Sequence, residues 1–296
     1  MEVGHDDTTA GTDGAGRVSP ATGPSGGRIH LGGAQQTMLG TLWCRAVDAR
    51  RRRPILGDHA AVHAVDRIDH PFHRLGVDAM TVAVTCTRAR WMDERVARFL
   101  AGHARATVLH LACGLDTRQQ RLRPGPGVQW FEVDQPDVIA VRRQVLPPPP
   151  GVELVDADVT DSGWFAAVPQ DRPTLVVAEG LSMYLDPERG RALLTRLAST
   201  LRGELIMDFN GRAGMVGQVL NRTVRRSRAR WTWLVDEPGS LQEHGPVLQE
   251  SVPLIDLLRA LDPRQLPLPR WLALQGSRLT PAPPAGLLAR YGLPGS

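Results

Sequence analysis

From residue 107 to residue 209 the sequence alternates between short β-rich runs and helical segments. The β-rich runs are TVLHL (107–111), VQWFEV (128–133), VELV (152–155), TLVVA (174–178) and ELIMDF (204–209). Two of the segments between them carry helix start signals, since Pro136 opens one and Asp186 with Pro187 precedes the other. Strands that alternate with helices form βαβ units with right-handed crossovers. The chain is therefore predicted to have an α/β fold with a parallel sheet.

The residues before this region show two other patterns. Residues 1–28 are mainly Gly, Thr, Ser, Asp and Pro, which offer little to bury, so we expect a disordered tail there. Apolar residues recur at intervals of three and four from Met38 to about Arg74, and again from Asp93 to Leu100. These intervals predict helices that lie ahead of the sheet in the chain.

Composition excludes several classes of protein. No apolar run approaches the ~18 to 20 residues that a membrane span needs. The first residues have neither the basic start nor the apolar core of a secretory signal. The three cysteines are too widely spaced for a disulfide framework or a zinc site. We therefore expect a cytoplasmic protein with no metal ion and no membrane partner.

All 35 cationic residues are arginine, and the formal net charge is +4. The densest run, Arg50 to Arg53, is followed at once by Pro54. Nucleic-acid binding would favour basic residues interleaved with aromatic ones, and aromatic residues make up only 5% of this chain. We interpret the run as a solvated face and expect no nucleic-acid partner.

Four acidic residues fall at or just beyond the ends of successive predicted strands. They are Asp134, Asp158, Glu179 and Asp208. In open parallel sheets, ligands bind in the crevice outside the carboxyl ends of the strands. The pattern predicts a ligand site at that edge of the sheet.

The loop after the first predicted strand is built of small residues and covers residues 112–117 (ACGLDT). It lies about 20 residues before Asp134, and this spacing is typical of an acid that binds ribose hydroxyls. It lacks the first and third glycines of a dinucleotide fingerprint, because Ala112 and Thr117 stand at those positions and only Gly114 is glycine. A nucleoside without a pyrophosphate fits it better, which disfavours a nicotinamide-dependent oxidoreductase. Asp116 either caps the next helix or contacts the ligand, and Cys113 is more consistent with space filling than with a nucleophile.

Four segments occur in an order and spacing typical of one family. They are VLHLACGLDTRQQRL, FEVDQPDVIAVRR, LVVAEGLSMYLDPERGRALL and GELIMDFNGR. Together they resemble the leucine carboxyl methyltransferase family, in particular its bacterial branch of polyketide O-methyltransferases. The resemblance implies a class I S-adenosylmethionine-dependent methyltransferase (Rossmann-like) fold with added cap helices. It divides the chain into the tail at 1–28, an N-terminal helical cap at 29–100, and a methyltransferase core at 101–296 with a substrate-cap insertion at about 211–235.

The resemblance also implies roles for matched positions. Arg88 would hold the methionine carboxylate of S-adenosylmethionine, and Ala112, Cys113 and Gly114 would face its methionine part. Asp134 would accept hydrogen bonds from its ribose hydroxyls. Asp158 and the backbone of Val159 would contact the adenine, and Glu179 would lie beside the sulfonium. Two features depart from the family. Ala112 stands where the family usually has Gly, and the chain ends in RLTPAPPAGLLARYGLPGS where the family usually has an apolar strand. We therefore expect the last strand of the sheet to be missing or built differently.

The expected activity is transfer of a methyl group from S-adenosylmethionine to a carboxylate or hydroxyl of a small, polyketide-like acceptor, with S-adenosylhomocysteine as product. The candidate catalytic residues are Glu179, Asp208, Arg212 and Tyr184. Asp208 or a nearby His would serve as a base for a phenol, and Arg212 would pair with an acceptor carboxylate. Met183, Trp231 and Trp233 are candidates for the walls of the acceptor pocket, although Trp233 and Trp231 could equally close the core. The alternative is a catalytically inactive nucleoside-binding or scaffold protein, and a homo-oligomer remains open.

Overall fold

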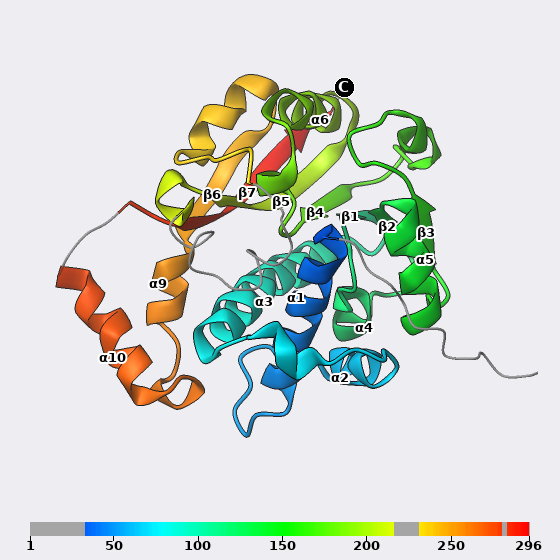
Figure 1. Ribbon diagram of the computed structural model, residues 1–296. Helices are drawn as coiled ribbons and strands as arrows, with labels where there is room; N and C mark the ends of the chain where they lie inside the picture. The colour runs from blue at the N-terminus through cyan, green and yellow to red at the C-terminus, as the bar shows by residue number, and fades with distance from the viewer. Residues whose placement is uncertain (1–32, 216–230, 280–282, 296) are drawn as a thin grey trace, which may run out of the picture.

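The computed structural model describes residues 33–215, 231–279 and 283–295 (Figure 1). The tail expected at residues 1–28 and the middle of the expected insertion lie outside these ranges. Within them, seven strands form one sheet in the order β3-β2-β1-β4-β5-β7-β6. The predicted α/β fold is confirmed.

Strands and helices alternate along the core as predicted. The strands are β1 (Ala106–Leu111), β2 (Val128–Asp134), β3 (Val152–Asp156), β4 (Thr174–Ala178), β5 (Arg202–Asn210), β6 (Val247–Pro253) and β7 (Gly286–Pro294). The helices are α1 (Gly33–Ala49), α2 (His59–Asp66), α3 (Ala79–Gly102), α4 (Arg118–Leu122), α5 (Pro136–Val145), α6 (Pro187–Thr200), α9 (Leu254–Arg259) and α10 (Leu268–Gly276). Short 3-10 helices at Phe72–Leu75, Ser182–Tyr184, Arg212–Gly214 and Pro238–His244 connect some of them.

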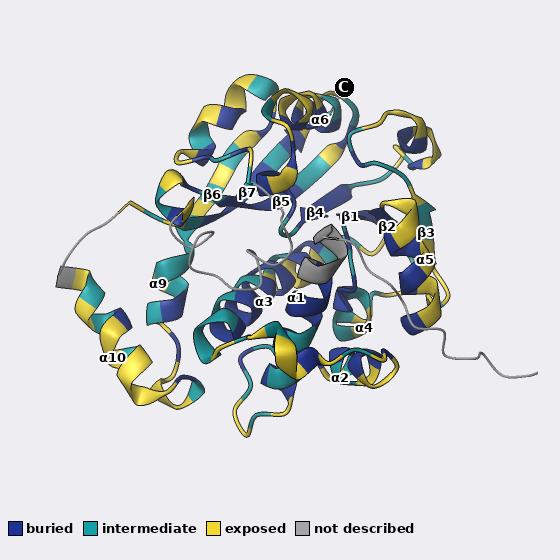
Figure 2. Cartoon of the chain, in the orientation of Figure 1, coloured by how far each residue is buried: buried dark blue, intermediate teal, exposed yellow. Residues whose placement is uncertain are grey.

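Side chains of the sheet alternate between two apolar layers. On β1, Leu109 and Leu111 belong to the layer that contains the leucines of α6, whereas Val108 belongs to the layer that contains α3. This alternation follows from the two-residue period of a strand, and it explains why central strands are apolar on both faces. Figure 2 shows the buried strands between partly exposed helices.

The helices before the sheet differ in their bounds from the sequence pattern. The pattern from Met38 to about Arg74 corresponds to α1, α2 and a 3-10 helix, and the predicted helix at Asp93–Leu100 is the end of the much longer α3. The second half of α3 packs directly on the sheet through Trp91, Met92 and Val96. No helix within the described ranges is long and apolar enough to cross a membrane.

The C-terminal strand that the sequence led us to doubt is present. β7 pairs antiparallel with β5 along its whole length and with β6 on its other side. The prolines misled the prediction, because Pro283 and Pro284 precede the strand and Pro294 is its last residue, where a missing N–H is tolerated. The apolar run between them supplies buried side chains to both layers, Leu287 and Ala289 to one and Leu288 to the other.

We expect Leu288→Ala to lower the free energy of unfolding by about 2 to 5 kcal/mol, because Leu288 is fully buried in the middle of the sheet. Urea denaturation measures this loss. Leu268→Ala is the matched control, since the Leu268 side chain on α10 is 59% exposed and its truncation should change stability by less than ~0.5 kcal/mol. Similar losses for the two variants would contradict the placement of β7 inside the sheet.

Candidate active site

Three of the predicted acids meet at the carboxyl edge of the sheet. Asp134 ends β2, Glu179 follows β4 directly, and Asp208 lies near the end of β5. β2 and β5 lie on either side of the central pair β1 and β4, all four running in parallel. The structure therefore places these acids at one edge, as their positions in the sequence predicted.

Asp134 is held by backbone donors. Its Oδ2 accepts from the N–H of Gly114 at 2.7 Å, and its Oδ1 accepts from the N–H of Gln135 at 2.8 Å. Burial raises the pKa of Asp134, while these two donors oppose the shift. A carboxylate has roughly four acceptor positions, so this one keeps capacity for hydroxyl donors from a ligand.

The loop after β1 takes an unusual backbone conformation. Ala112 and Gly114 both have φ of +49°, in the left-handed region. Glycine occupies that region without a steric cost, whereas alanine is strained there by about 1 to 2 kcal/mol. This explains physically why glycine suits the position of Ala112. Burial raises the pKa of the Cys113 thiol well above its usual range, which supports the space-filling interpretation of Cys113.

Beneath the strand ends lies a group of buried charges that we call the ionic cluster. It consists of Arg45, Arg88, Arg118 and Arg121 together with Asp58, Asp93, Asp116, Glu179 and Asp208. Its members come from α1, the start of α2, α3, α4 and the strand ends, so the cluster joins the N-terminal helices to the sheet. Four cations and five carboxylates leave it with one formal negative charge in excess.

Glu179 contacts three arginines at the sheet edge. Arg45 Nη2 lies 3.2 Å and Arg88 Nε 3.1 Å from its Oε1, and Arg118 Nη2 lies 2.6 Å from its Oε2. Burial alone would raise the pKa of Glu179, but the three guanidinium groups outweigh it and lower the pKa from 4.5 to about 2. Glu179 is therefore a fixed negative charge at neutral pH.

Asp208 differs from Glu179 because fewer cations reach it. Its Oδ2 pairs with Arg88 Nη1 at 3.0 Å, and its Oδ1 accepts from the N–H of Gly180 at 2.6 Å. Burial raises the pKa of Asp208, and the single arginine opposes this shift without overcoming it. Arg88 thus bridges Glu179, which follows β4, and Asp208, which lies on β5.

Sequence reasoning missed most of the cluster. Arg45, Arg118, Arg121, Asp58 and Asp93 were not singled out, and Asp116 was left between a helix cap and a ligand contact. Asp116 accepts from the backbone N–H of Arg118 at 2.9 Å and also pairs with arginines. A usable signal existed, since Asp93 and Arg45 interrupt apolar helix faces where a solvated charge is not expected.

His110 borders the ionic cluster from the middle of β1. Its Nε2 lies 3.3 Å from Arg118 Nη1 and 3.7 Å from Asp116 Oδ2. Burial lowers the pKa of His110 to about 3, so the imidazole is neutral at physiological pH and is a weak base.

Of the candidate residues on the acceptor side, Tyr184 lies near Arg88 of the ionic cluster, and its side chain is 37% exposed. Thr232 is hydrogen-bonded to the 3-10 helix that contains Tyr184, because the N–H of Thr232 donates to the carbonyl oxygen of Met183 at 2.8 Å. Trp231 is half-buried beside this contact.

Two expected pocket walls are core residues instead. Met183 is buried, and Trp233 packs edge-on against Phe209 and covers Gly190 of α6, where any Cβ would meet the indole ring.

Arg212 is 85% exposed and pairs with Asp236 at 3.4 Å, not with Glu179 or Asp208. Asp158 does not join the ionic cluster, because its partners are Thr160, Arg189 and Gln135, the residue directly after Asp134, and the adjoining Val159 is buried.

Comparison with known proteins gives a family and a fold. The model of the family described as leucine carboxyl methyltransferase matches residues 39–198. The tetracenomycin polyketide synthesis O-methyltransferase TcmP of Streptomyces glaucescens is 37% identical over 83% of this chain and 92% of its own length. The S-adenosyl-L-methionine-dependent methyltransferase dpfgK of Gibberella zeae is 36% identical over 75% of this chain and 82% of its own. A candidate methyltransferase of Thermobifida fusca, of known crystal structure, superposes with a TM-score of 0.53 at 18% identity, over 86% of this chain and 94% of that one.

We expect Glu179→Gln to lower the free energy of unfolding at pH 7 by about 3 to 5 kcal/mol, because it leaves three buried guanidinium groups undercompensated. The pKa of Glu179 is depressed in the folded state, so its stabilisation is complete above about pH 4.5 and is lost as the pH falls toward 2. Urea titrations across that range should show a shallower pH dependence for the variant. Glu188→Gln, at an exposed position on α6, is the control, and an unchanged slope in Glu179→Gln would refute the role of the arginines.

Proposed function

Because this chain belongs to the leucine carboxyl methyltransferase family, we propose that it methylates an oxygen atom of a small, polyketide-like acid or hydroxyl compound. It is an S-adenosylmethionine-dependent methyltransferase with the class I fold. The observation that supports the proposal best is the fixed negative charge of Glu179 between Asp134 and Asp208 at the carboxyl edge of the sheet.

The charge of the ionic cluster fits the cofactor. S-adenosylmethionine carries an ammonium, a sulfonium and a carboxylate, and thus one positive charge in total. The cluster has one formal negative charge in excess, so the two balance. Glu179 would face the sulfonium, whereas S-adenosylhomocysteine lacks that cation and gains less from the site.

Arg88 retains donors for the cofactor's carboxylate. Its Nε and Nη1 are engaged by Glu179 and Asp208, and Nη2 has no partner among the described residues. At position 180, the Cβ of any residue other than glycine would lie 3.7 Å from this Nη2. Because position 180 is glycine, a ligand can approach Nη2 from that side. The guanidinium group carries five N–H donors, so Arg88 would bind a third carboxylate without releasing the two acids.

The remaining cofactor contacts follow from the family positions. Asp134 would accept from ribose hydroxyls, and Ala112, Cys113 and Gly114 would lie along the methionine part. Asp158 and Val159 would meet the adenine ring at the end of β3.

A carboxylate acceptor fits the described residues better than a phenol. A phenol has a pKa of about 10 and benefits from a base, whereas a carboxylic acid is ionised at neutral pH. His110 is buried and too weak a base, and Asp208 is paired with Arg88. Arg212 is exposed just after β5 and would attract an anionic acceptor.

The protein's work in this reaction is alignment and exclusion of water. Bound S-adenosylmethionine supplies a methyl group that is already electrophilic. Glu179, held by Arg45, Arg88 and Arg118, keeps its charge at one place without reorganisation. Tyr184 and Trp231 would border the acceptor and orient its oxygen, and positioning of this kind contributes up to ~7 to 11 kcal/mol in favourable systems.

We expect Asp134→Ala to weaken S-adenosylhomocysteine binding by about 2 to 3 kcal/mol, because it removes a charged acceptor for ribose hydroxyls. Titration calorimetry measures the loss. Asp156→Ala is the matched control, since Asp156 ends β3 in register with Asp134 and is exposed. Unchanged affinity in a folded Asp134→Ala protein would refute the ribose contact.

Incubation with labelled S-adenosylmethionine and a panel of aromatic acids and phenols tests the acceptor. With an acid, we expect a rate that is nearly flat from about pH 6 to 9, since the nucleophile is ionised throughout. Arg212→Ala should raise KM for the acid and leave cofactor affinity unchanged. A rate that rises about tenfold per pH unit would indicate hydroxyl methylation instead. Cofactor binding without transfer to any compound would favour the inactive scaffold.

A further inference from the structure

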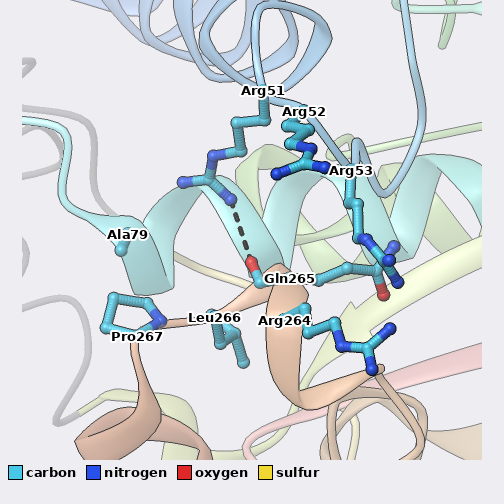
Figure 3. A pocket seen from close by; sticks show the side chains of 8 residues that line it. All are labelled: Arg51, Arg52, Arg53, Ala79, Arg264, Gln265, Leu266 and Pro267. Carbon is cyan, nitrogen blue, oxygen red and sulfur yellow. Dashed lines mark hydrogen bonds between the residues drawn. The ribbon is translucent and has the colours of Figure 1, made fainter.

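A second site of concentrated charge lies outside the ionic cluster. It is a hollow of about 590 Å³, which we call the arginine hollow (Figure 3). Its lining residues are Arg51, Arg52, Arg53, Ala79, Arg264, Gln265, Leu266 and Pro267. No residue of the ionic cluster lines it, and no acidic residue is among the lining residues.

Two segments far apart in the sequence are fastened together to form the hollow. Arg51 Nη1 donates to the carbonyl oxygen of Gln265 at 3.3 Å, and Gln265 Nε2 donates to the carbonyl oxygen of Pro54 at 3.0 Å. On the second segment, Asp262 and Gln265 form a capping box that fixes the turn carrying Arg264. The hollow is therefore formed by the fold before any ligand binds.

The positive charge of the hollow is poorly compensated. Arg53 lies 3.5 Å from Asp262, whose other oxygen accepts from the backbone N–H of Arg264. The guanidinium groups of Arg52 and Arg264 have no partner among the described residues. Two cations thus face a concave surface with no carboxylate to neutralise them, an arrangement that favours a divalent anion.

A solvated face accounts for only part of the run at Arg50 to Arg53. Arg50 fits it, since its side chain pairs with exposed Asp66 and lies over Trp43. The other three are brought opposite Arg264, more than 200 residues later in the chain, as Figure 3 shows.

We propose that the arginine hollow binds a phosphate monoester. Guanidinium groups match phosphate oxygens with paired N–H donors, and a phosphate monoester is largely dianionic above about pH 7, which matches the two unpartnered arginines. Ala79 and Pro267 give the hollow an apolar side, against which the organic part of the ester packs.

Titration calorimetry at pH 8 with phenyl phosphate, inorganic phosphate and benzoate tests the proposal. S-adenosylhomocysteine is present at saturation, so that the cofactor site is filled. We expect phenyl phosphate to bind at least about tenfold more tightly than benzoate, because of its second charge, and more tightly than inorganic phosphate, because of its ring. Equal affinity for inorganic phosphate and the ester would overturn the assignment of an organic ligand.

The double variant Arg52→Ala/Arg264→Ala removes the two unpartnered guanidinium groups and no hydrogen bond among described residues, so it should fold with an unchanged Tm. We expect it to bind phenyl phosphate at least about tenfold more weakly and S-adenosylhomocysteine as the unaltered protein does. The matched control, Arg98→Ala/Arg143→Ala, makes the same change in net charge at exposed positions of α3 and α5 and should retain phenyl phosphate binding.

The outcomes separate this proposal from the proposed function. An equal loss of phenyl phosphate affinity in both double variants would mean that binding responds only to net charge. No loss of affinity in either variant would mean that the ester binds elsewhere. Each result overturns the hollow as the site. Loss of S-adenosylhomocysteine binding in Arg52→Ala/Arg264→Ala would overturn the independence of the two sites. A failure of methyl transfer leaves these measurements unaffected.

Discussion

The carboxylate of Glu179, held by three buried guanidinium groups, is the interaction on which the rest of the site depends. Arg45 comes from α1, Arg88 from α3 and Arg118 from α4, so one acid at a strand end orients three helices. A buried charge without partners is costly, and each arginine is satisfied only when the helices lie where the structure has them. The geometry of the N-terminal helices and the charge of the site are therefore set by the same contacts.

Such a cluster is a poor source of stability compared with apolar packing, because desolvation offsets most of the attraction. Its value lies in an electrostatic field that is already in place. Water at the strand ends would have to reorient around a cation, whereas the fixed charges of Glu179 and Asp208 need not. The apolar layers on both faces of the sheet stabilise the fold, and their stabilisation offsets the unfavourable free energy of burying these charges.

The sequence was informative where local pattern decides structure. Strand ends follow from local apolar runs, so the sequence predicts Asp134, Glu179 and Asp208 at one edge of the sheet. Their arginine partners were beyond reach, since Arg45 and Glu179 are 134 positions apart and no local rule joins them. β7 was doubted for a related reason, because its flanking prolines are local signals whereas its pairing with β5 is not. The roles of Arg212 and Asp158 depend on ligands and stay predictions.

The position of β7 between β5 and β6 has a consequence for how the chain acquires its structure. β6 pairs with the rest of the sheet only through β7, although it precedes β7 in the chain. During synthesis the five parallel strands can assemble in order, but β5 keeps an open edge until β7 is available. Completion of the sheet therefore waits for β7, and a polypeptide interrupted before Gly286 would present that unpaired edge to other molecules.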